Sequence, residues 1–254
     1  MLKSRVMPCL LLHNDSLVKT VKFKDPSYIG DPINAIRIYN EKEVDELIVL
    51  DITATIEERR PPIKILKEIA SECFMPVAYG GGIRNLEDIK TIFNLGIEKV
   101  ALNTYAAENP SFIRMAADEF GSQSIIVSID ARKKASERYE VCTHGGRKAT
   151  KLDPAQYAVQ MEAMGAGEIL LTSIDQDGTQ EGYDVELIRQ VTSAVGIPVI
   201  ACGGAGKISD IGKAVKQGGA AACAAGSMVV YFGRNRAVLI NFPARKELEE
   251  ELAN

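Results

Sequence analysis

The chain has 254 residues, 46% of them hydrophobic and 25% charged, and its formal net charge is −4 at pH 7. So many apolar residues with so little net charge exclude a disordered chain, and the slight acidity argues against nucleic acid as a partner. Apolar stretches such as residues 48–50 have the length of strands, far below the roughly 20 residues that span a bilayer, so we expect no membrane segment.

The cysteines and the N-terminal segment indicate the compartment. Five cysteines (Cys9, Cys73, Cys142, Cys202 and Cys223) are scattered without a C-x-x-C pair, and the two histidines lie far apart. The sequence therefore predicts no disulfide framework, no metal site and no cofactor. The apolar run 6–12 is followed by the polar residues HND, where a signal peptide would have a small-residue cleavage site. We expect a cytoplasmic protein.

Apolar, β-branched runs alternate along the chain with longer stretches of helical spacing. The predicted strands are residues 6–12, 47–51, 77–79, 99–102, 125–130, 169–172, 199–201 and 221–225. Predicted helices include 62–72, 86–95, 154–164 and 185–193, and the Lys- and Arg-rich segment 131–150 is expected to be a solvated loop. Apolar strands separated by helices indicate a parallel sheet covered on its outer side. Eight such units in 254 residues predict an α/β fold, a single (β/α)8 TIM barrel domain spanning residues 1–254.

The two halves of the chain resemble each other at an offset of 122 residues. The segment 46–50 (ELIVL) corresponds to 168–172 (EILLT), and 76–82 (PVAYGGG) corresponds to 198–204 (PVIACGG). This offset is too long for a solenoid repeat of about 20–50 residues. Any two βα units share some of this pattern, but the paired Glu and paired Gly positions favour a barrel built from two duplicated half-barrels.

Two glycine clusters, 80–82 and 203–206, stand where predicted strands end. Active sites of such barrels lie at this end of the strands, and glycine lets backbone N–H groups approach an anion closely. The clusters, with polar residues that end two further strands, predict two phosphate sites on opposite sides of one barrel mouth. The predicted residues are Gly81, Gly82, Asn103, Thr104, Gly203, Gly204, Gly226 and Ser227. A small molecule phosphorylated at both ends would span them; the alternative is tight turns without a ligand.

Acidic residues also end predicted strands, at Asp51, Asp130, Asp175 and Asp177. A carboxylate in such a place can exchange a proton if its pKa suits the reaction, although Asp is also a common helix cap or loop anchor. Asp130, directly after the apolar run 125–129, is the candidate catalytic residue. Asp51 and Asp177 are candidates for ligand binding.

Longer motifs carry a family resemblance. They include segments 30–32 (GDP), 50–54 (LDITA), 120–123 (FGSQ), 129–131 (IDA), 165–168 (GAGE), 170–179 (LLTSIDQDGT) and 203–207 (GGAGK). With these motifs the sequence resembles, over essentially its whole length, the cyclase subunit of imidazole glycerol phosphate synthase, the ammonia-using barrel of histidine biosynthesis.

The resemblance implies a partner and a route for ammonia. Members of this family take ammonia from a glutaminase subunit docked at the N-terminal face of the barrel and pass it through the barrel core. A ring of charged residues guards the entrance, and its counterparts here are Arg5, Glu46, Lys99 and Glu168. The resemblance also adds Lys19 to the residues expected to bind a phosphorylated small-molecule ligand.

One departure from the family pattern concerns catalysis. The family uses two aspartates for acid/base work, one after the first strand and one matching Asp130. Where the family reads Asp-Val-Lys-Asp-Gly, this chain reads LLHND from Leu11 to Asp15. Leucine cannot exchange a proton, and the loss of one such group costs roughly 10²–10⁴ in rate. Cyclase turnover is therefore in doubt.

The departure resembles a paralogous branch of the family, found with surface-polysaccharide genes, a glutaminase and an ATP-dependent N-acetyl sugar amidotransferase. Our leading hypothesis is that the barrel passes ammonia onward, so that an acetamido group of the sugar becomes an acetamidino group. One alternative is the true cyclase of histidine biosynthesis. Another is a non-catalytic scaffold that switches its glutaminase on when a phosphorylated ligand binds.

Overall fold

The computed structural model describes residues 4–233 and 235–253. Within them, eight parallel strands form a closed barrel: β1 (Arg5–His13), β4 (Leu47–Asp51), β5 (Val77–Gly80), β6 (Lys99–Leu102), β7 (Ile125–Lys133), β10 (Glu168–Ser173), β11 (Val199–Cys202) and β12 (Ala222–Ala225). The ring closes because β12 pairs with β1 and β7 pairs with β10. The predicted (β/α)8 barrel is confirmed, whereas the domain boundaries 1–254 stay a prediction because their ends lie outside the described residues.

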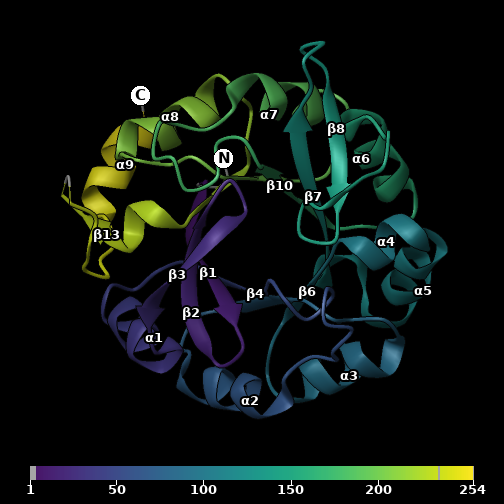
Figure 1. The fold of residues 1–254 in the computed structure, drawn as a ribbon, viewed down its shortest axis with the longest axis horizontal. Helices are drawn as coiled ribbons and strands as arrows, with labels where there is room; N and C mark the ends of the chain where they lie inside the picture. Colours follow the sequence, from purple (N-terminus) through teal and green to yellow (C-terminus); the bar gives the residue numbers. More distant parts are fainter. Residues whose placement is uncertain (1–3, 234, 254) are drawn as a thin grey trace.

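Helices surround the barrel, as Figure 1 shows in a view along its axis. They are α1 (Pro32–Glu41), α2 (Ile63–Glu72), α3 (Leu86–Asn94), α4 (Thr104–Glu108), α5 (Ser111–Phe120), α6 (Pro154–Ala163), α7 (Val185–Thr192), α8 (Ile208–Lys216) and α9 (Arg245–Ala253). Four of them begin after an Asp or Asn whose side chain accepts a backbone hydrogen bond from the first turn. No helix in the described part of the chain is both long and apolar enough to cross a membrane.

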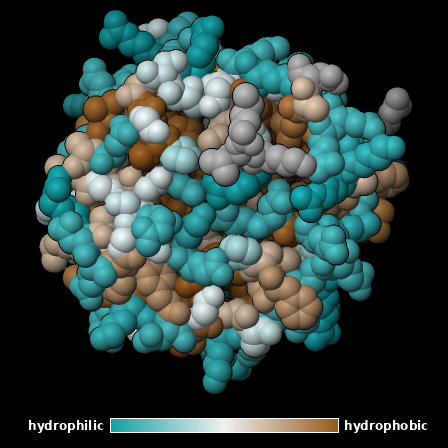
Figure 2. Space-filling model, turned by 180° about the vertical axis from the view of Figure 1, so that it is seen from behind, coloured by the Kyte–Doolittle hydropathy of each residue, from teal (hydrophilic) through white to brown (hydrophobic). Residues whose placement is uncertain are grey.

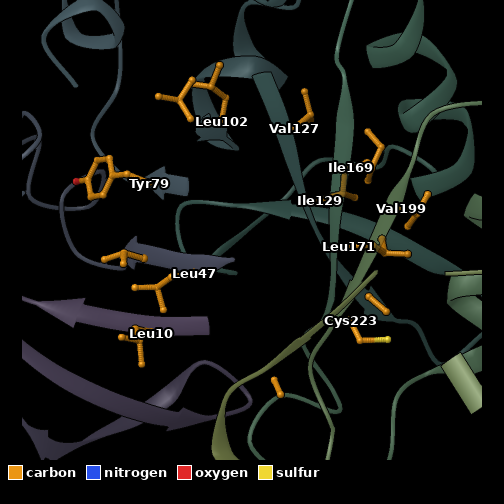
Figure 3. Packing of buried hydrophobic residues seen from close by; sticks show 14 of the residues in the cluster. Leu10, Leu47, Tyr79, Leu102, Val127, Ile129, Ile169, Leu171, Val199 and Cys223 are labelled. Carbon is orange, nitrogen blue, oxygen red and sulfur yellow. The ribbon is translucent and has the colours of Figure 1, made fainter. Parts of the chain in front are cut away.

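The barrel strands divide their side chains between two separate hydrophobic clusters, because successive residues of a strand point to opposite faces. The larger cluster lies between the sheet and the helices, and Figure 3 shows part of it, including Leu47 and Val127. The smaller cluster fills the inside of the barrel. Its buried members are Met7, Cys9, Ile48, Ala78, Ala101, Ile126, Leu170, Ile200, Ala222 and Ala224. Three of the strands, β5, β6 and β12, contribute alanines, so small side chains occupy much of this inner column.

The expectation of a loop over residues 131–150 is wrong. β7 continues beyond the barrel and pairs in antiparallel fashion with β8 (Tyr139–Thr143), which pairs with β9 (Lys148–Ala149). The charged residues hid this pairing, but Val141 and Cys142 are buried and anchor the extension. A second extension consists of β2 (Ser16–Val21) and β3 (Lys24–Gly30), which continue β1. A short hairpin, β13 (Tyr231–Phe232) and β14 (Ala237–Val238), follows β12.

The internal duplication is visible in the element boundaries. β5 begins at residue 77 and β11 at residue 199, so they differ by 122 positions. α2 and α7 begin at 63 and 185, and α3 and α8 begin at 86 and 208, which gives the same difference. The two half-barrels therefore place equivalent residues at the same height on opposite sides of the ring.

Replacing Asp153 by Ala tests how α6 is fixed at its start. The Asp153 carboxylate accepts hydrogen bonds from the backbone N–H groups of Ala155 and Gln156, both at 3.0 Å. Loss of such a cap costs roughly 0.5–2 kcal/mol, which should lower the Tm by about 1–8 °C in a chain of this size. Thermal unfolding followed by circular dichroism measures this. Gln156→Ala keeps the cap and should melt close to the wild type; equal melting of the two variants would contradict the capping role.

Candidate functional site

The carboxyl ends of the barrel strands surround a cavity of about 710 Å³, which we call the mouth. All twelve residues predicted for catalysis or ligand binding line it: Lys19, Asp51, Gly81, Gly82, Asn103, Thr104, Asp130, Asp177, Gly203, Gly204, Gly226 and Ser227. Asp175, the other acidic residue predicted at a strand end, is not among the residues that line the mouth. Its carboxylate accepts a hydrogen bond from the backbone N–H of Lys133 at 2.7 Å. The structure brings the predicted residues together, while their roles toward a ligand stay predictions.

The glycines of both clusters are required by the path of the chain. Gly82 has φ +70°, and a Cβ there would lie 2.5 Å from the carbonyl oxygen of Arg59. Gly204 has φ +112°, and its Cβ would lie 2.1 Å from the carbonyl oxygen of Gly182. Side chains are excluded at both positions, so the backbone itself forms these walls of the mouth.

Asp130 lies in the mouth with an unusual protonation equilibrium. Burial, and secondarily the neighbouring carboxylate of Asp177, raise the pKa of Asp130 to about 7. The Asn103 side chain opposes this shift and donates a hydrogen bond to the carboxylate at 3.1 Å. A carboxyl group with this pKa can both donate and accept a proton near neutral pH.

Asp177 holds the β2–β3 hairpin over the mouth. Its carboxylate accepts hydrogen bonds from the Thr20 hydroxyl at 2.9 Å and from the backbone N–H of Phe23 at 3.4 Å. Its carbonyl oxygen accepts a third bond, from the backbone N–H of Lys22 at 2.9 Å. Burial raises the pKa of Asp177, and the bond from Thr20 opposes that shift. The carboxylate therefore acts as a loop anchor in this structure.

Asp51 is also used within its own loop. Its side chain is fully buried and accepts hydrogen bonds from the backbone N–H groups of Thr53 at 3.0 Å and Ala54 at 2.9 Å. Arg59 completes the arrangement with an ion pair at 3.3 Å. The loop-anchor alternative accounts for every contact of this carboxylate.

Lys19 places a buried ammonium group at the mouth. Its Nζ donates a hydrogen bond of 2.6 Å to the carbonyl oxygen of Cys9, and burial lowers the pKa of Lys19. A Cβ on Gly226 would lie 2.7 Å from this Nζ, so the glycine provides the space that the ammonium occupies.

Leu11 stands in the mouth where the family pattern expects an acid. It packs against the inner cluster and lines the cavity. Cys9 and His13, which lie two residues before and after it along β1, also line the cavity. The neighbouring Cys9 thiol, and secondarily burial, raise the pKa of Cys202, from β11, well above its usual value. Cys202 and His13 were not among the predicted site residues, although the two-residue alternation of a strand places His13 with Leu11.

A closed ring of ion pairs lies at the opposite end of the barrel. Lys99 Nζ is 2.8 Å from Glu46 Oε1 and 3.0 Å from Glu168 Oε1. Arg5 Nη2 is 3.2 Å from Glu168 Oε1, and the other guanidinium nitrogen, Nη1, contacts Glu46 Oε2. The glutamate side chains are only 4% and 12% exposed. We call these residues the charged ring.

Comparisons with known proteins agree with this geometry. A family model described as "Histidine biosynthesis protein" matches residues 5–235. The chain is 51% identical over 249 residues to "Putative imidazole glycerol phosphate synthase subunit hisF2" of Pseudomonas aeruginosa, with 98% of this chain and 99% of the relative covered.

Two further relatives have similar names and similar coverage. "Putative imidazole glycerol phosphate synthase subunit HisF" of Leptospira interrogans is 46% identical over 250 residues, or 98% of each chain. "Putative imidazole glycerol phosphate synthase subunit hisF3" of Vibrio vulnificus is 43% identical over 253 residues, or 99% of this chain and 97% of the relative. The chain thus belongs to the histidine biosynthesis protein family, as a barrel of the HisF type.

Proposed function

We propose that this HisF-like barrel receives ammonia from a glutaminase at the end with the charged ring and passes it to an acceptor at the mouth. The observation that carries the proposal is the contrast between the two ends of the barrel. The charged ring is complete, whereas Leu11 occupies the place of a proton-exchanging group in the mouth. A barrel that only conducts ammonia needs the entrance residues but does not need two proton-exchanging groups in the mouth.

The charged ring supports a gating role. Two acids and two bases neutralise each other, which offsets the cost of holding charges near the core. Two buried glutamate oxygens of the ring, Glu46 Oε1 and Glu168 Oε2, receive no hydrogen bond from the part of the chain that the structure describes. Glu46 Oε1 has its ion pair with Lys99, whereas no ion pair involves Glu168 Oε2 among the described residues. An unsatisfied buried acceptor is costly, and an incoming ammonia molecule carries the N–H donors that would satisfy it.

The inside of the barrel favours neutral ammonia over ammonium. The column above the charged ring is lined by aliphatic side chains, including Ala78, Ala101 and Ala222. Transfer of an unpaired charge into such surroundings is strongly unfavourable, while a small neutral molecule meets a much lower barrier. The column therefore admits neutral ammonia and excludes the ammonium ion.

The face at which the strands begin suits a partner protein. Phe74, between α2 and β5, is 87% exposed there, and its backbone N–H donates to the side chain of Asn40. Figure 2 shows this face, with hydrophobic residues gathered in patches between hydrophilic ones. An exposed aromatic ring on the face where the strands begin is the kind of anchor that protein interfaces use, and we assign this face to the glutaminase.

The family branch indicates the acceptor and the compartment. We propose an ATP-dependent N-acetyl sugar amidotransferase of surface-polysaccharide biosynthesis as the ammonia consumer, because Leu11 and the neighbouring residues resemble the branch that accompanies such enzymes. The cytoplasm is the proposed location, in keeping with five free cysteines in the structure. The glycine clusters are the proposed binding site for a phosphorylated small molecule, either a substrate or an activator.

A second candidate is the cyclase of histidine biosynthesis. It is favoured by Asp130, whose pKa of about 7 suits acid/base work, and by the glycine walls of the mouth. Leu11 opposes it, because the mouth then lacks the second proton-exchanging aspartate of the family.

Lys99→Met tests the conduit. The change removes one base from the charged ring and leaves both glutamates with Arg5 alone, so glutamine hydrolysis should continue while ammonia transfer to the acceptor falls roughly tenfold, an effect of about 1.4 kcal/mol. The measurement is the ratio of acceptor product to glutamate formed by the assembled complex. Lys90→Met, at an exposed position on α3, is the matched control. Unchanged coupling in Lys99→Met would refute the conduit.

Leu11→Asp tests the two candidate functions against each other. With ammonium salt in place of the glutaminase, the wild type should give no cyclase turnover on the histidine-pathway precursor, and Leu11→Asp should gain some. Any gained turnover should fall as the pH drops below about 7, because Asp130 is then protonated and can no longer accept a proton. Leu11→Asn, of similar size but without a carboxylate, is the control. Turnover by the wild type at the level of the Leu11→Asp variant would favour the cyclase.

A further inference from the structure

Exposed hydrophobic side chains concentrate on one side of the mouth. Nine large hydrophobic residues are exposed in the described part of the chain, and five of them lie on or next to the β2–β3 and β13–β14 hairpins. These five are Val21, Tyr28, Phe232, Val238 and Leu239, which we call the rim patch. Tyr28 and Phe232 are 69% and 67% exposed. Large apolar side chains gathered and exposed in one region of the surface often mark a binding site.

A groove of about 380 Å³ runs between the two hairpins. Tyr28 on one side and Val238 on the other line it, and Lys19 and Thr20 line both the groove and the mouth. The two openings are therefore adjacent, with Lys19 and Thr20 as shared lining residues. Figure 1 shows β13 on the same side of the barrel as β2 and β3.

Both hairpins are fixed to one short loop. Asp177 holds the β2–β3 hairpin, as described above, and the carbonyl oxygen of Gly178 accepts a hydrogen bond from Arg236 at 3.1 Å. The Arg236 guanidinium also lies 4.7 Å from the centre of the Tyr231 ring, which braces β13 against β14. The groove is thus preformed, which lowers the entropic cost of binding.

The groove also has a definite charge and a free strand edge. Arg236 lines the groove, and the exposed Lys22 and Lys24 lie in the chain between the lining residues Val21 and Asp25. Among the described lining residues, Asp25 is the one acid. Among the described strands, β3 pairs only with β2, so its other edge offers unpaired backbone groups to an extended segment. An occupant should therefore be extended, apolar in part and acidic.

We propose that the rim patch and its groove are the docking surface for the enzyme that consumes ammonia at the mouth, which inserts an extended apolar segment flanked by acidic side chains. This inference rests on the proposed function, because ammonia that leaves at the mouth escapes to water unless the acceptor covers the rim. A second copy of this chain fits less well: a two-fold interface here would bring the lysines of both copies together.

The test uses the complex of the barrel with its glutaminase and the purified N-acetyl sugar amidotransferase of the same organism. Biolayer interferometry measures the Kd for the wild type, for Tyr28→Ser/Phe232→Ser and for Lys22→Glu/Lys24→Glu. Each double variant should raise the Kd at least tenfold and lower the coupling of glutamine hydrolysis to product, while glutamine hydrolysis itself stays unchanged. Met115→Ser, 52% exposed on α5, should bind like the wild type. Thermal unfolding checks that each variant is folded.

Three results would overturn the inference. If both rim variants bind the amidotransferase as tightly as the wild type, the docking surface lies elsewhere, and intact coupling would leave the proposed function standing. If the wild type does not bind the amidotransferase, this enzyme is not the partner that docks at the rim patch. If light scattering shows a self-associated wild type that Tyr28→Ser/Phe232→Ser dissociates, the patch joins two copies. Failure of the proposed function itself appears separately, as unchanged coupling in Lys99→Met.

Discussion

The closure of the eight barrel strands into a ring is the constraint on which the other features of this protein depend. When eight parallel strands close into a ring, every strand begins at one end of the barrel and finishes at the other. Charged residues at strand starts are therefore forced together, and so are glycines and acids at strand ends. Alternation along each strand then separates the inner column from the helix-covered core. One end of the barrel therefore gathers charged side chains and the other end gathers glycines and acids, as a direct result of the strand directions.

Local pattern predicted the barrel well because each βα unit carries its own signal. The predicted strand 47–51 matches β4 at both ends, and the predicted helix 62–72 begins one residue before α2. The two strand extensions escaped prediction for a physical reason. β3 is exposed along most of its length, and β8 and β9 sit in a highly charged segment, so neither shows the apolar run that a barrel strand requires.

The candidate site was predictable as a set of positions but not as a set of contacts. Strand ends converge by topology, so Asp51, Asp130 and Asp177 were expected near one another. Asp51 is held by residues of its own loop, but Asp177 accepts a hydrogen bond from Thr20 across 157 positions, and local sequence pattern carries no trace of that pairing. The charged ring was predicted only from the family resemblance, because the sequence around isolated charges at strand starts does not show that these charges will contact one another.

The half-barrel duplication has a consequence for how the charged ring could open. Glu46 and Glu168 are equivalent positions, 122 residues apart, but Arg5 and Lys99 are not, so the acids are symmetric and the bases are not. Arg5 uses a separate guanidinium nitrogen for each glutamate, whereas Lys99 contacts both through a single nitrogen. Rotation of one flexible side chain would break two ion pairs at once on the lysine side, while the arginine side stayed in place. In the proposed conduit, Lys99 is therefore the part of the charged ring that would move, and Arg5 is the part that would keep the two glutamates in place.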